Sequence, residues 1–344
     1  MLSSGLLPVD PNPVDGVEPL NKCLAAVDLG GTKIYTALAD SRGKLLAETR
    51  VPTNPGEGME AVIRRIAGTV EEVYNSGGAG RDICCLGMGV PGPVDPETGV
   101  LYQAPNLGWR DVHLKKILQK RFAVPVLVDN DANLAALGEH TFGAGAGERN
   151  MVYVTVSTGI GGGLILDGKI YHGASGGAGE VGHMVVEPMG PLCGCGKRGC
   201  LEALASGTAM AARAREMAGA GAGRAILAEA GGRIEDIDAG AVAAAAGRGD
   251  EEALEILWGA GRALGMGLAN VVNLLNPGLV VLGGGAMNAG KPLWETMEEE
   301  LRSRAMPGAL ERVKVVPAAL GKRSGLLGAV ALAMGGRPPG DFPQ

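Results

Sequence analysis

The sequence of 344 residues is poor in aromatic side chains, with three Phe, five Tyr and three Trp. Single-stranded nucleic acids are usually bound by stacking on such rings, so this mode of binding has little support. An excess of positive charge is also missing, because 31 basic residues stand against 37 acidic ones and the net charge is −6. Nucleic-acid-binding surfaces are usually basic, and we therefore expect no nucleic-acid partner.

Long apolar runs are missing as well. No stretch reaches the roughly 18 uncharged apolar residues of a membrane span, and the best candidate covers only residues 326–334. Residues 1–22 have neither the basic start nor the apolar centre of a secretory signal, and their Pro and Asp content is typical of a disordered tail. Six cysteines in a chain of this length do not indicate a disulfide scaffold. These absences predict a cytoplasmic protein with no membrane partner.

Glycine, by contrast, is abundant, at 59 of the 344 residues, where ordinary usage would be about 7%. Three glycine-rich turns follow predicted strands at residues 23–28, 151–156 and 279–282. A single turn of this kind is more simply a tight hairpin. Three of them, one preceded by Asp28 and another rich in Ser and Thr, favour phosphate binding, because a backbone without Cβ can point its N–H groups at an anion.

The rest of the pattern alternates between strands and helices. Periodicity predicts helices over 59–74, 132–140 and 325–334 and a mostly helical region over 207–275. Further strands are predicted at 34–38, 83–90, 124–128, 164–166 and 313–316, and a long loop covers 173–202. The first and second strand–glycine–strand units lie about 125 residues apart, which suggests two related α/β halves.

Two familiar nucleotide motifs are excluded. No Walker loop is present, since Lys33 follows Thr32 instead of preceding it. Two G-x-G-x-x-G matches, at 87–92 and 194–199, lack the helix that a dinucleotide fold requires, because the first runs into prolines and the second lies among cysteines.

The loop over 173–202 contains the sharpest local signal, three thiols and one imidazole: Cys193, Cys195, Cys200 and His183. This set suits tetrahedral zinc, and four protein ligands would leave no open position, so the metal would be structural. The alternatives are free buried thiols or a disulfide. The glycines between the cysteines argue against the first, and a reducing cytoplasm argues against the second. The other cysteines, Cys23, Cys84 and Cys85, lie in apolar strands and are expected in the core.

Several polar residues are ambiguous by themselves. Asp131 lies between a predicted strand and a helix, where it could be a helix N-cap or a catalytic carboxylate, and its position alone favours neither. Asn106 lies in a turn. Glu180, His183 and Glu202 would ordinarily be surface groups, but a zinc-bound loop would hold them near one another.

Together these stretches resemble the ROK family of sugar kinases and repressors, over residues 23–335. The family's first phosphate motif appears as DLGGTK at 28–33, and its second as STGIGGG at 157–163. Its signature cluster appears as GEVGH at 179–183 and CGCGKRGCLE at 193–202. The cysteine cluster and the two phosphate motifs together make this resemblance specific.

The resemblance implies an α/β, actin-like (ribonuclease H-like) fold with two domains and an active site in a central cleft. It implies a small domain at 23–137, with a helix at about 322–335 packing back on it, and a large domain at 138–321 that contains the zinc loop. Residues 1–22 and 336–344 are expected to be tails. A homodimer, or a dimer of such dimers, is expected from the family.

The resemblance also assigns roles to single residues, with Asp131 as the general base. The residues that correspond to sugar-hydroxyl binders are Asn106, Asn130, Asp131, Glu180, His183 and Glu202. Those that correspond to phosphate and adenosine sites are Asp28, Gly30, Gly31, Thr32, Lys33, Thr158, Gly159, Gly161, Gly162, Gly163 and Gly284. The zinc ligands are His183, Cys193, Cys195 and Cys200, and His183 would also touch the sugar.

The implied reaction is the ATP-dependent phosphorylation of glucose at its 6-hydroxyl, with ATP, Mg²⁺ and a structural Zn²⁺. A carboxylate can accept the proton of this weakly nucleophilic hydroxyl, while Mg²⁺ and loop N–H groups stabilise the developing charge. Kinases for N-acetylmannosamine, N-acetylglucosamine, fructose or allose are the alternatives, since these sugars share the hydroxyls concerned. A sugar-sensing repressor is the remote alternative, because residues 1–22 are too few for a helix-turn-helix and both phosphate motifs are intact.

Overall fold

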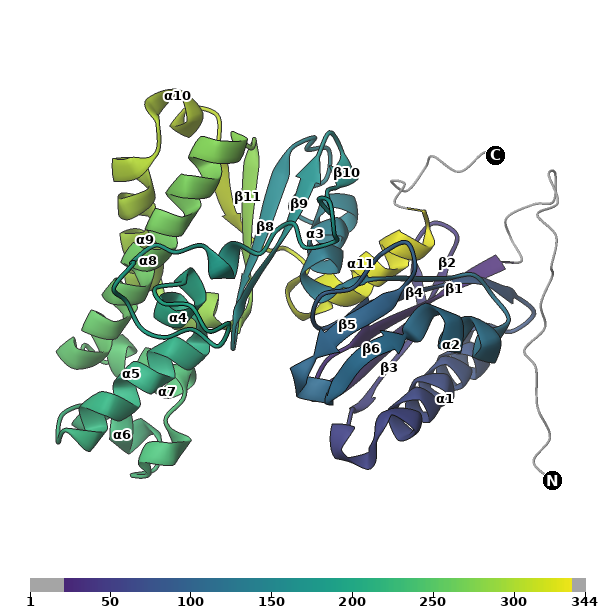
Figure 1. Cartoon of the computed structure of the whole chain (residues 1–344), viewed down its shortest axis with the longest axis horizontal. Coiled ribbons are helices and arrows are strands. Elements are labelled where there is room, and N and C mark those ends of the chain that lie inside the picture. Colours follow the sequence, from purple (N-terminus) through teal and green to yellow (C-terminus); the bar gives the residue numbers. More distant parts are fainter. Residues whose placement is uncertain (1–21, 336–344) are drawn as a thin grey trace. The chain divides into compact units, whose positions relative to one another are not determined.

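Two five-stranded sheets organise the chain in the computed structural model, which describes residues 22–335 (Figure 1). The expected tails therefore lie outside the described residues, except that the first strand already begins at Lys22. Within the described range, one compact unit comprises residues 22–147, 163–178 and 322–335, and the other comprises 148–162 and 179–321. Each unit is considered by itself below.

The sheet of the first unit has the strand order β3-β2-β1-β4-β7. Its strands are β1 (Lys22–Leu29), β2 (Lys33–Asp40), β3 (Leu45–Pro52), β4 (Asp82–Val90) and β7 (Val126–Asn130). The first three pair antiparallel, whereas β1, β4 and β7 run parallel. Their carboxyl ends therefore meet at one edge, where α/β folds usually carry their chemistry.

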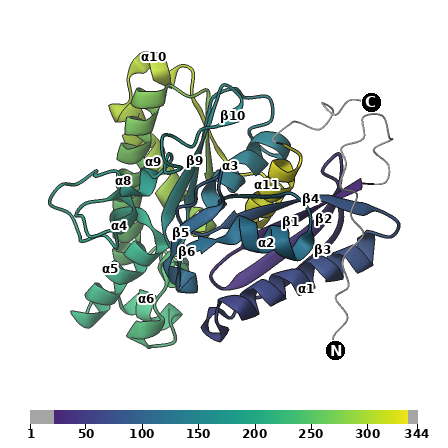
Figure 2. The same cartoon turned by 45° about the vertical axis from the view of Figure 1, so that its right-hand side comes forward.

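Helices cover both faces of this sheet. The apolar side chains of β1 alternate, so that Cys23, Ala25 and Val27 join one buried cluster and Leu24 and Ala26 join the other. The first cluster is completed by α1 (Met59–Gly77) and α2 (Leu114–Phe122), and the second by α3 (Asp131–Phe142) and α11 (Ser324–Ala333). Figures 1 and 2 show α1 and α11 on opposite faces of the sheet.

Two glycines allow α3 and α11 to pack with their backbones in contact. A Cβ at Gly328 would lie 1.7 Å from the carbonyl oxygen of Leu134, and one at Gly138 would lie 2.3 Å from that of Ser324. No side chain fits either gap. Part of the glycine excess therefore allows close packing between α3 and α11.

The second sheet has the order β10-β9-β8-β11-β12. Its strands are β8 (Met151–Val156), β9 (Ile160–Leu166), β10 (Lys169–Ile170), β11 (Leu279–Gly283) and β12 (Lys314–Pro317). Strand β11 pairs parallel with β8 and β12, whereas β10 pairs antiparallel with β9. The division between the two compact units falls within β9. A small hairpin of β5 (Val100–Ala104) and β6 (Trp109–His113) belongs to the first unit.

Seven helices of the described chain belong to the second unit: α4 (Leu201–Ala205), α5 (Gly207–Gly219), α6 (Arg224–Glu229), α7 (Ala239–Gly247), α8 (Glu251–Leu275), α9 (Lys291–Arg304) and α10 (Pro307–Leu310). The two longest, α8 and α9, lie side by side (Figure 1). A Cβ at Gly265 would lie 2.6 Å from the carbonyl oxygen of Met297, and one at Gly261 would lie 2.9 Å from that of Leu293. These glycines therefore also serve close helix packing.

Most predicted elements are confirmed within a few residues, including the helix from Met59 and the strand Met151–Val156. The predicted turn over 157–163 is wrong in its second half, because β9 begins at Ile160 and includes the three glycines that follow. Cys23 is buried as predicted, but Cys84 and Cys85 are only partly buried. Within residues 22–335, no helix is both long enough and apolar enough for a membrane span.

Candidate active site

Asp131 stands at the junction of β7 and α3. The N-cap of α3 is Asn130, not Asp131, because the Asn130 Oδ1 atom accepts hydrogen bonds from the N–H groups of Ala132 at 2.9 Å and Asn133 at 3.3 Å. The Asn130 Nδ2 atom donates to the carbonyl oxygen of Gly92 at 3.1 Å. Asp131 is the first residue of the helix, is exposed, and accepts from the N–H of Ala132 at 2.8 Å. The junction thus presents a carboxylate on a fixed backbone.

A second carboxylate, Asp28, lies beside this junction. Asp28 and Gly89 are paired residues on neighbouring strands. A Cβ at Gly89 would lie 3.6 Å from Asp28 Oδ1 and 3.9 Å from the Asp131 Cα, so both acidic residues flank this glycine. Burial raises the pKa of Asp28 to about 6, although Lys33 and Arg50 oppose the shift. The first unit therefore brings the first phosphate motif and the predicted base together.

The turn between β1 and β2 is a tight one, in which the N–H of Gly30 donates to the Lys33 carbonyl at 2.9 Å. The hydroxyl of Thr53, the residue that follows β3, donates to the carbonyl oxygen of Gly30 at 2.7 Å and stabilises the turn. Asn106, in the short 3₁₀ helix Pro105–Leu107, packs directly on it, since a Cβ at Gly31 would lie 2.8 Å from the Asn106 Cβ. Asn106 is thus brought to the first glycine turn, and only glycine fits at position 31.

In the second unit, the turn before β9 is shorter than the motif predicts. The N–H of Ser157 donates to the Gly159 carbonyl at 2.8 Å, and β9 starts at the next residue. Glu202 reaches into this turn, where its Oε2 atom accepts from the N–H of Ile160 at 2.8 Å. A Cβ at Gly159 would lie 2.5 Å from the same oxygen. The structure therefore joins a predicted sugar ligand to the second phosphate motif.

Other glycines of the predicted phosphate and adenosine sites are required by backbone packing. A Cβ at Gly162 would lie 2.8 Å from the Gly179 carbonyl oxygen, and one at Gly163 would lie 2.9 Å from that of Ala132. At Gly284, where φ is 91°, a Cβ would lie 2.2 Å from the carbonyl oxygen of Val156. Packing alone accounts for these glycines, and ligand contact at them stays a prediction.

The three cysteines and the histidine of the predicted metal set meet in the second unit. Their ligand atoms all lie within 4.8 Å of one another. The Cys193 Sγ atom lies 3.7 Å from the Nδ1 atom of His183, and the Sγ atoms of Cys195 and Cys200 are also 3.7 Å apart. Bond lengths of 2.0–2.3 Å in a tetrahedron around zinc would give separations of about 3.5–3.8 Å. The four residues therefore fit a tetrahedral metal ion.

The raised pKa of one cysteine also supports a bound cation. Burial, together with the neighbouring thiols, raises the pKa of Cys200 to about 12, so a thiolate there needs a cation beside it. The other ring nitrogen of His183, Nε2, lies 3.9 Å from the Glu180 carboxylate. The imidazole therefore turns one nitrogen to the thiols and the other toward a predicted sugar ligand.

A pocket of about 510 Å³ lies beside the second turn, wholly within the second unit. Its walls come from α5, α7 and the 3₁₀ helix Gly285–Ala289, next to Gly284. The polar side chains that line it are Ser157, Thr158, Thr208, Arg215, Asp238 and Asn288. Sequence reasoning missed the last four: Thr208, Arg215 and Asp238 lie in a helical region that carries no phosphate motif, and Asn288 lies three residues beyond the third glycine turn. Asp238 also caps α7, since its side chain accepts from the N–H of Ala241 at 2.8 Å.

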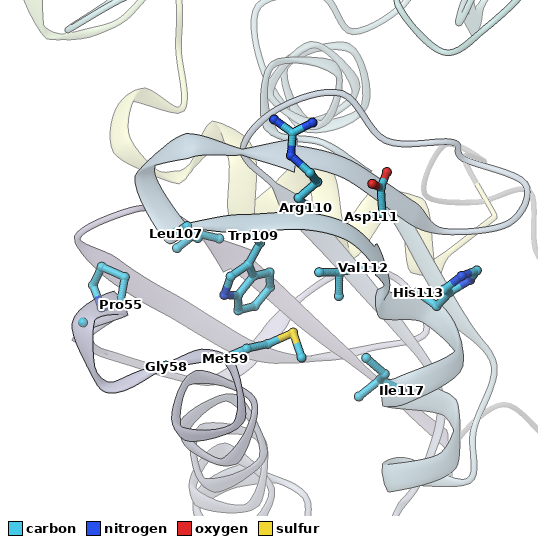
Figure 3. Close-up of a pocket in the computed structure, with 12 residues that line it drawn as sticks. Pro55, Gly58, Met59, Leu107, Trp109, Arg110, Asp111, Val112, His113 and Ile117 are labelled. Atoms are coloured by element: carbon cyan, nitrogen blue, oxygen red, sulfur yellow. The ribbon is translucent and has the colours of Figure 1, made fainter.

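A pocket of about 650 Å³ in the first unit was also missed (Figure 3). None of the predicted site residues lines it, although Leu107 follows Asn106 directly. Trp109, Met59 and Ile117 project toward its interior, whereas Arg110 points away. The indole Nε1 of Trp109 is buried and has no hydrogen-bond partner among the described residues.

Within each unit, then, the structure assembles part of the predicted set. The first unit holds the turn Gly30–Lys33, Asp28, Asn106, Asn130 and Asp131, and the second holds the Ser157–Gly159 turn, Glu180, Glu202 and the metal cluster. Each sheet has a glycine turn after its central strand and helices around it, as expected for the actin-like class of phosphotransferase folds, and similarity to solved ROK kinases confirms the predicted fold class.

The chain belongs to the ROK family, whose model matches residues 24–335. It is 38% identical over 304 residues to a glucokinase of Halalkalibacterium halodurans, which covers 88% of this chain and 92% of the relative. A xylose repressor of Caldicellulosiruptor bescii is 32% identical and covers 90% of this chain, but the match spans 78% of the repressor.

Solved structures give the same family. A ROK family glucokinase from Streptomyces griseus, solved in complex with glucose and AMPPNP, has a TM-score of 0.76 and 35% identity. The match covers 90% of this chain and 99% of that one. The predicted membership is confirmed.

Proposed function

We propose that this protein is a glucokinase that transfers the terminal phosphate of ATP to the 6-hydroxyl of glucose. The observation that carries the proposal is the β7–α3 junction, where Asn130 caps the helix that Asp131 begins. Asp28 of the first phosphate motif lies on the other side of Gly89 from Asp131. Similarity to glucokinases over about nine-tenths of the chain, and to one solved with glucose and AMPPNP, supports it.

In this proposal Asp131 is the general base. Its carboxylate is exposed at the start of α3 and can reach a sugar hydroxyl. It accepts the hydroxyl proton as the oxygen attacks the phosphorus, a role typically worth about 10²–10⁴ in rate. Asn130 uses its oxygen for the cap and one amide hydrogen for Gly92, which leaves one amide hydrogen for the sugar.

The remaining sugar ligands are Asn106 in the first unit and Glu180, His183 and Glu202 in the second. Each offers a directional polar group, and a hexose is distinguished by many such contacts, since an unpaired buried partner costs about 1–3 kcal/mol. The Glu202 Oε2 atom accepts from the N–H of Ile160, and the Oε1 atom, 3.9 Å from the Cys193 Sγ atom, would meet the hydroxyl beside the metal cluster.

ATP would be bound by the two glycine turns and the pocket beside the second. The Thr158 and Thr208 hydroxyls, Arg215 and Asn288 line that pocket and offer the donors and acceptors that a nucleoside needs. Mg²⁺ is the divalent ion proposed to accompany ATP. Asp28 is the carboxylate that directly precedes the first glycine turn. Burial raises its pKa because the charged form is costly there, and a bound cation would offset that cost. Bound Mg²⁺ would neutralise phosphate charge.

Zinc is the metal proposed for His183, Cys193, Cys195 and Cys200. The ligand separations and the three thiols suit zinc, and four protein ligands make the site structural. The expected homodimer and the cytoplasmic location stay predictions, as do the kinase alternatives for fructose, allose, N-acetylglucosamine and N-acetylmannosamine.

The test is ADP release from ATP against a panel of these hexoses and N-acetylhexosamines at matched concentration, together with glucose 6-phosphate formation when polyphosphate replaces ATP. We expect the largest kcat/KM for glucose and no glucose 6-phosphate from polyphosphate. A larger kcat/KM for another sugar would reassign the substrate, and the absence of sugar-dependent ADP release with every sugar would overturn the kinase assignment.

A further inference from the structure

Asp129, two residues before Asp131, is a buried carboxylate whose hydrogen-bond partners Asn130, Asn133 and His172 all belong to the first unit. It is only 1% exposed and lies at the end of β7, in register with Gly89 and, through it, with Asp28. Its Oδ1 atom accepts from the N–H of Asn130 at 2.7 Å and from the Asn133 Nδ2 atom at 2.9 Å. This oxygen therefore holds the backbone immediately before the predicted base.

The second oxygen of Asp129 is paired with His172. The Nε2 atom of His172 lies 2.6 Å from Asp129 Oδ2, and the imidazole is one-quarter exposed. His172 follows β10 in the segment 163–178, which belongs to the first unit although the residues on both sides of it belong to the second. Its hydrogen bond with Asp129 raises the pKa of His172, against the effect of burial.

The loop that carries His172 is anchored on the same unit. The carbonyl oxygen of His172 accepts from the N–H of Ala178 at 3.1 Å, which closes the loop. Gly176, with a φ of 81°, comes so near the Val94 carbonyl oxygen that a Cβ would lie 2.6 Å from it. The imidazole is therefore held against Asp129 by a loop with a defined path.

We propose that His172 is a positioning residue for phosphoryl transfer: by binding Asp129, it fixes the β7–α3 junction that carries Asp131. This inference rests on the proposed role of Asp131 as the base. A buried carboxylate that loses one of its donors must either take up a proton or move toward water. Either response alters the bonds that Asp129 makes to Asn130 and Asn133, and so moves the residue next to the base.

The magnitude follows from geometry. A displacement of about 1 Å in a reacting group costs up to roughly 10²-fold in rate, while substrate binding through other residues is retained. His172 is not among the residues proposed above to bind the sugar or the nucleotide. Its loss should therefore lower kcat and leave the KM for ATP unchanged. Because a smaller folded fraction would give the same division, kcat is expressed per folded chain, and the comparison with His172→Gln separates the two explanations.

The test compares His172→Leu with His172→Gln in the full-length, metal-loaded protein. Leucine removes the donor, whereas glutamine retains an N–H that can reach Asp129. We expect kcat to fall about 10–100-fold in His172→Leu with less than about a threefold change in the KM for ATP. His172→Gln should recover kcat to within about threefold of the wild type. His113→Leu, at an exposed histidine of the same unit, is the matched control and should match the wild type.

Two outcomes would overturn the proposal: a wild-type kcat in His172→Leu, or an equal loss in His172→Gln and His172→Leu. If the leucine variant does not fold, His172→Ala replaces it with the same expectation. Asp131→Ala is measured in parallel. If that variant retained turnover, the proposed base would be wrong, whereas a normal His172→Leu beside an inactive Asp131→Ala would reject only the role of His172.

Discussion

The two compact units hold their candidate site residues by different means. In the first, Asn130 and Asp131 follow a buried strand and open a helix, and hydrogen bonds among protein groups fix them. In the second, Glu180 and His183 lie between residues 179 and 200, where the 3₁₀ helix Val181–His183 is the one helical element. The thiols that fit a metal lie beside them. A hydrogen-bonded junction forms with the fold, whereas a metal-bound loop depends on its ion. The two units should therefore fail in different ways.

The largest effect is expected where the first unit carries the chemistry. Asp131→Ala should lower kcat by about 10²–10⁴-fold, because no other group would take the hydroxyl proton, and the Kd for glucose should change little. Turnover is followed by ADP release and binding by calorimetry. Glu71→Ala, an exposed carboxylate on α1, is the control. Near-wild-type turnover in Asp131→Ala would reject the assignment.

The next largest effect is expected in the second unit, where glucose binding should depend on the bound metal. Metal analysis should find one zinc ion per chain, and Cys195→Ser should lower the zinc content and raise the KM for glucose at least about tenfold, because Glu180 and His183 lose their support. Cys84→Ser changes a cysteine outside the cluster and should change neither quantity. Hydrogen exchange at α3 should be the same in both variants. If metal-free protein bound glucose as well as the zinc-loaded protein does, the proposed metal dependence of the second unit would be wrong.

The smallest predicted effect concerns the stability of the first unit. The pKa of Asp28 is raised in the folded chain to about 6 from 3.8, so the folded chain binds more protons than the unfolded chain between these values. The free energy of unfolding therefore falls as pH rises from about 4 to 6, and the loss is complete above pH 6. Asp28→Asn should raise the free energy of unfolding by about 2 kcal/mol at pH 7.5 and leave it nearly unchanged at pH 4.

Urea denaturation without nucleotide or added magnesium measures this difference at both pH values. The same variant should lose phosphoryl transfer, which would show that a buried carboxylate is retained for function at the expense of stability. Equal stability changes at pH 4 and pH 7.5 would mean that the effect does not come from the ionisation of Asp28.

The sequence predicts the metal set and the strand ends well, because both depend on local patterns. Cys193, Cys195 and Cys200 lie close in the chain, so their meeting needs only one loop. The parallel ends of β1, β4 and β7 follow from short apolar runs that end at acidic residues in β1 and β7 and at a Pro-Gly-Pro segment after β4. The role of Asn130 as N-cap was missed because Asn130 and Asp131 are equally good capping residues, and only the start of the helix distinguishes them.

Long-range contacts could not be predicted in this way. His172 and Asp129 are 43 residues apart, and nothing in either sequence context indicates that they pair. The lining of the second-unit pocket joins Thr158, Arg215 and Asn288 from three separate segments. The glycines at 161–163 predict a turn because glycine is common in turns, whereas in the structure they belong to β9 and have close backbone neighbours.

The central claim is tested most directly by the product itself. Wild-type protein is incubated with ATP, Mg²⁺ and glucose, and the glucose 6-phosphate formed is measured beside the ADP released. The account predicts one glucose 6-phosphate for each ADP, with formation lost in Asp131→Ala under the same conditions. ADP release without glucose 6-phosphate, or equal formation by the variant, would contradict it.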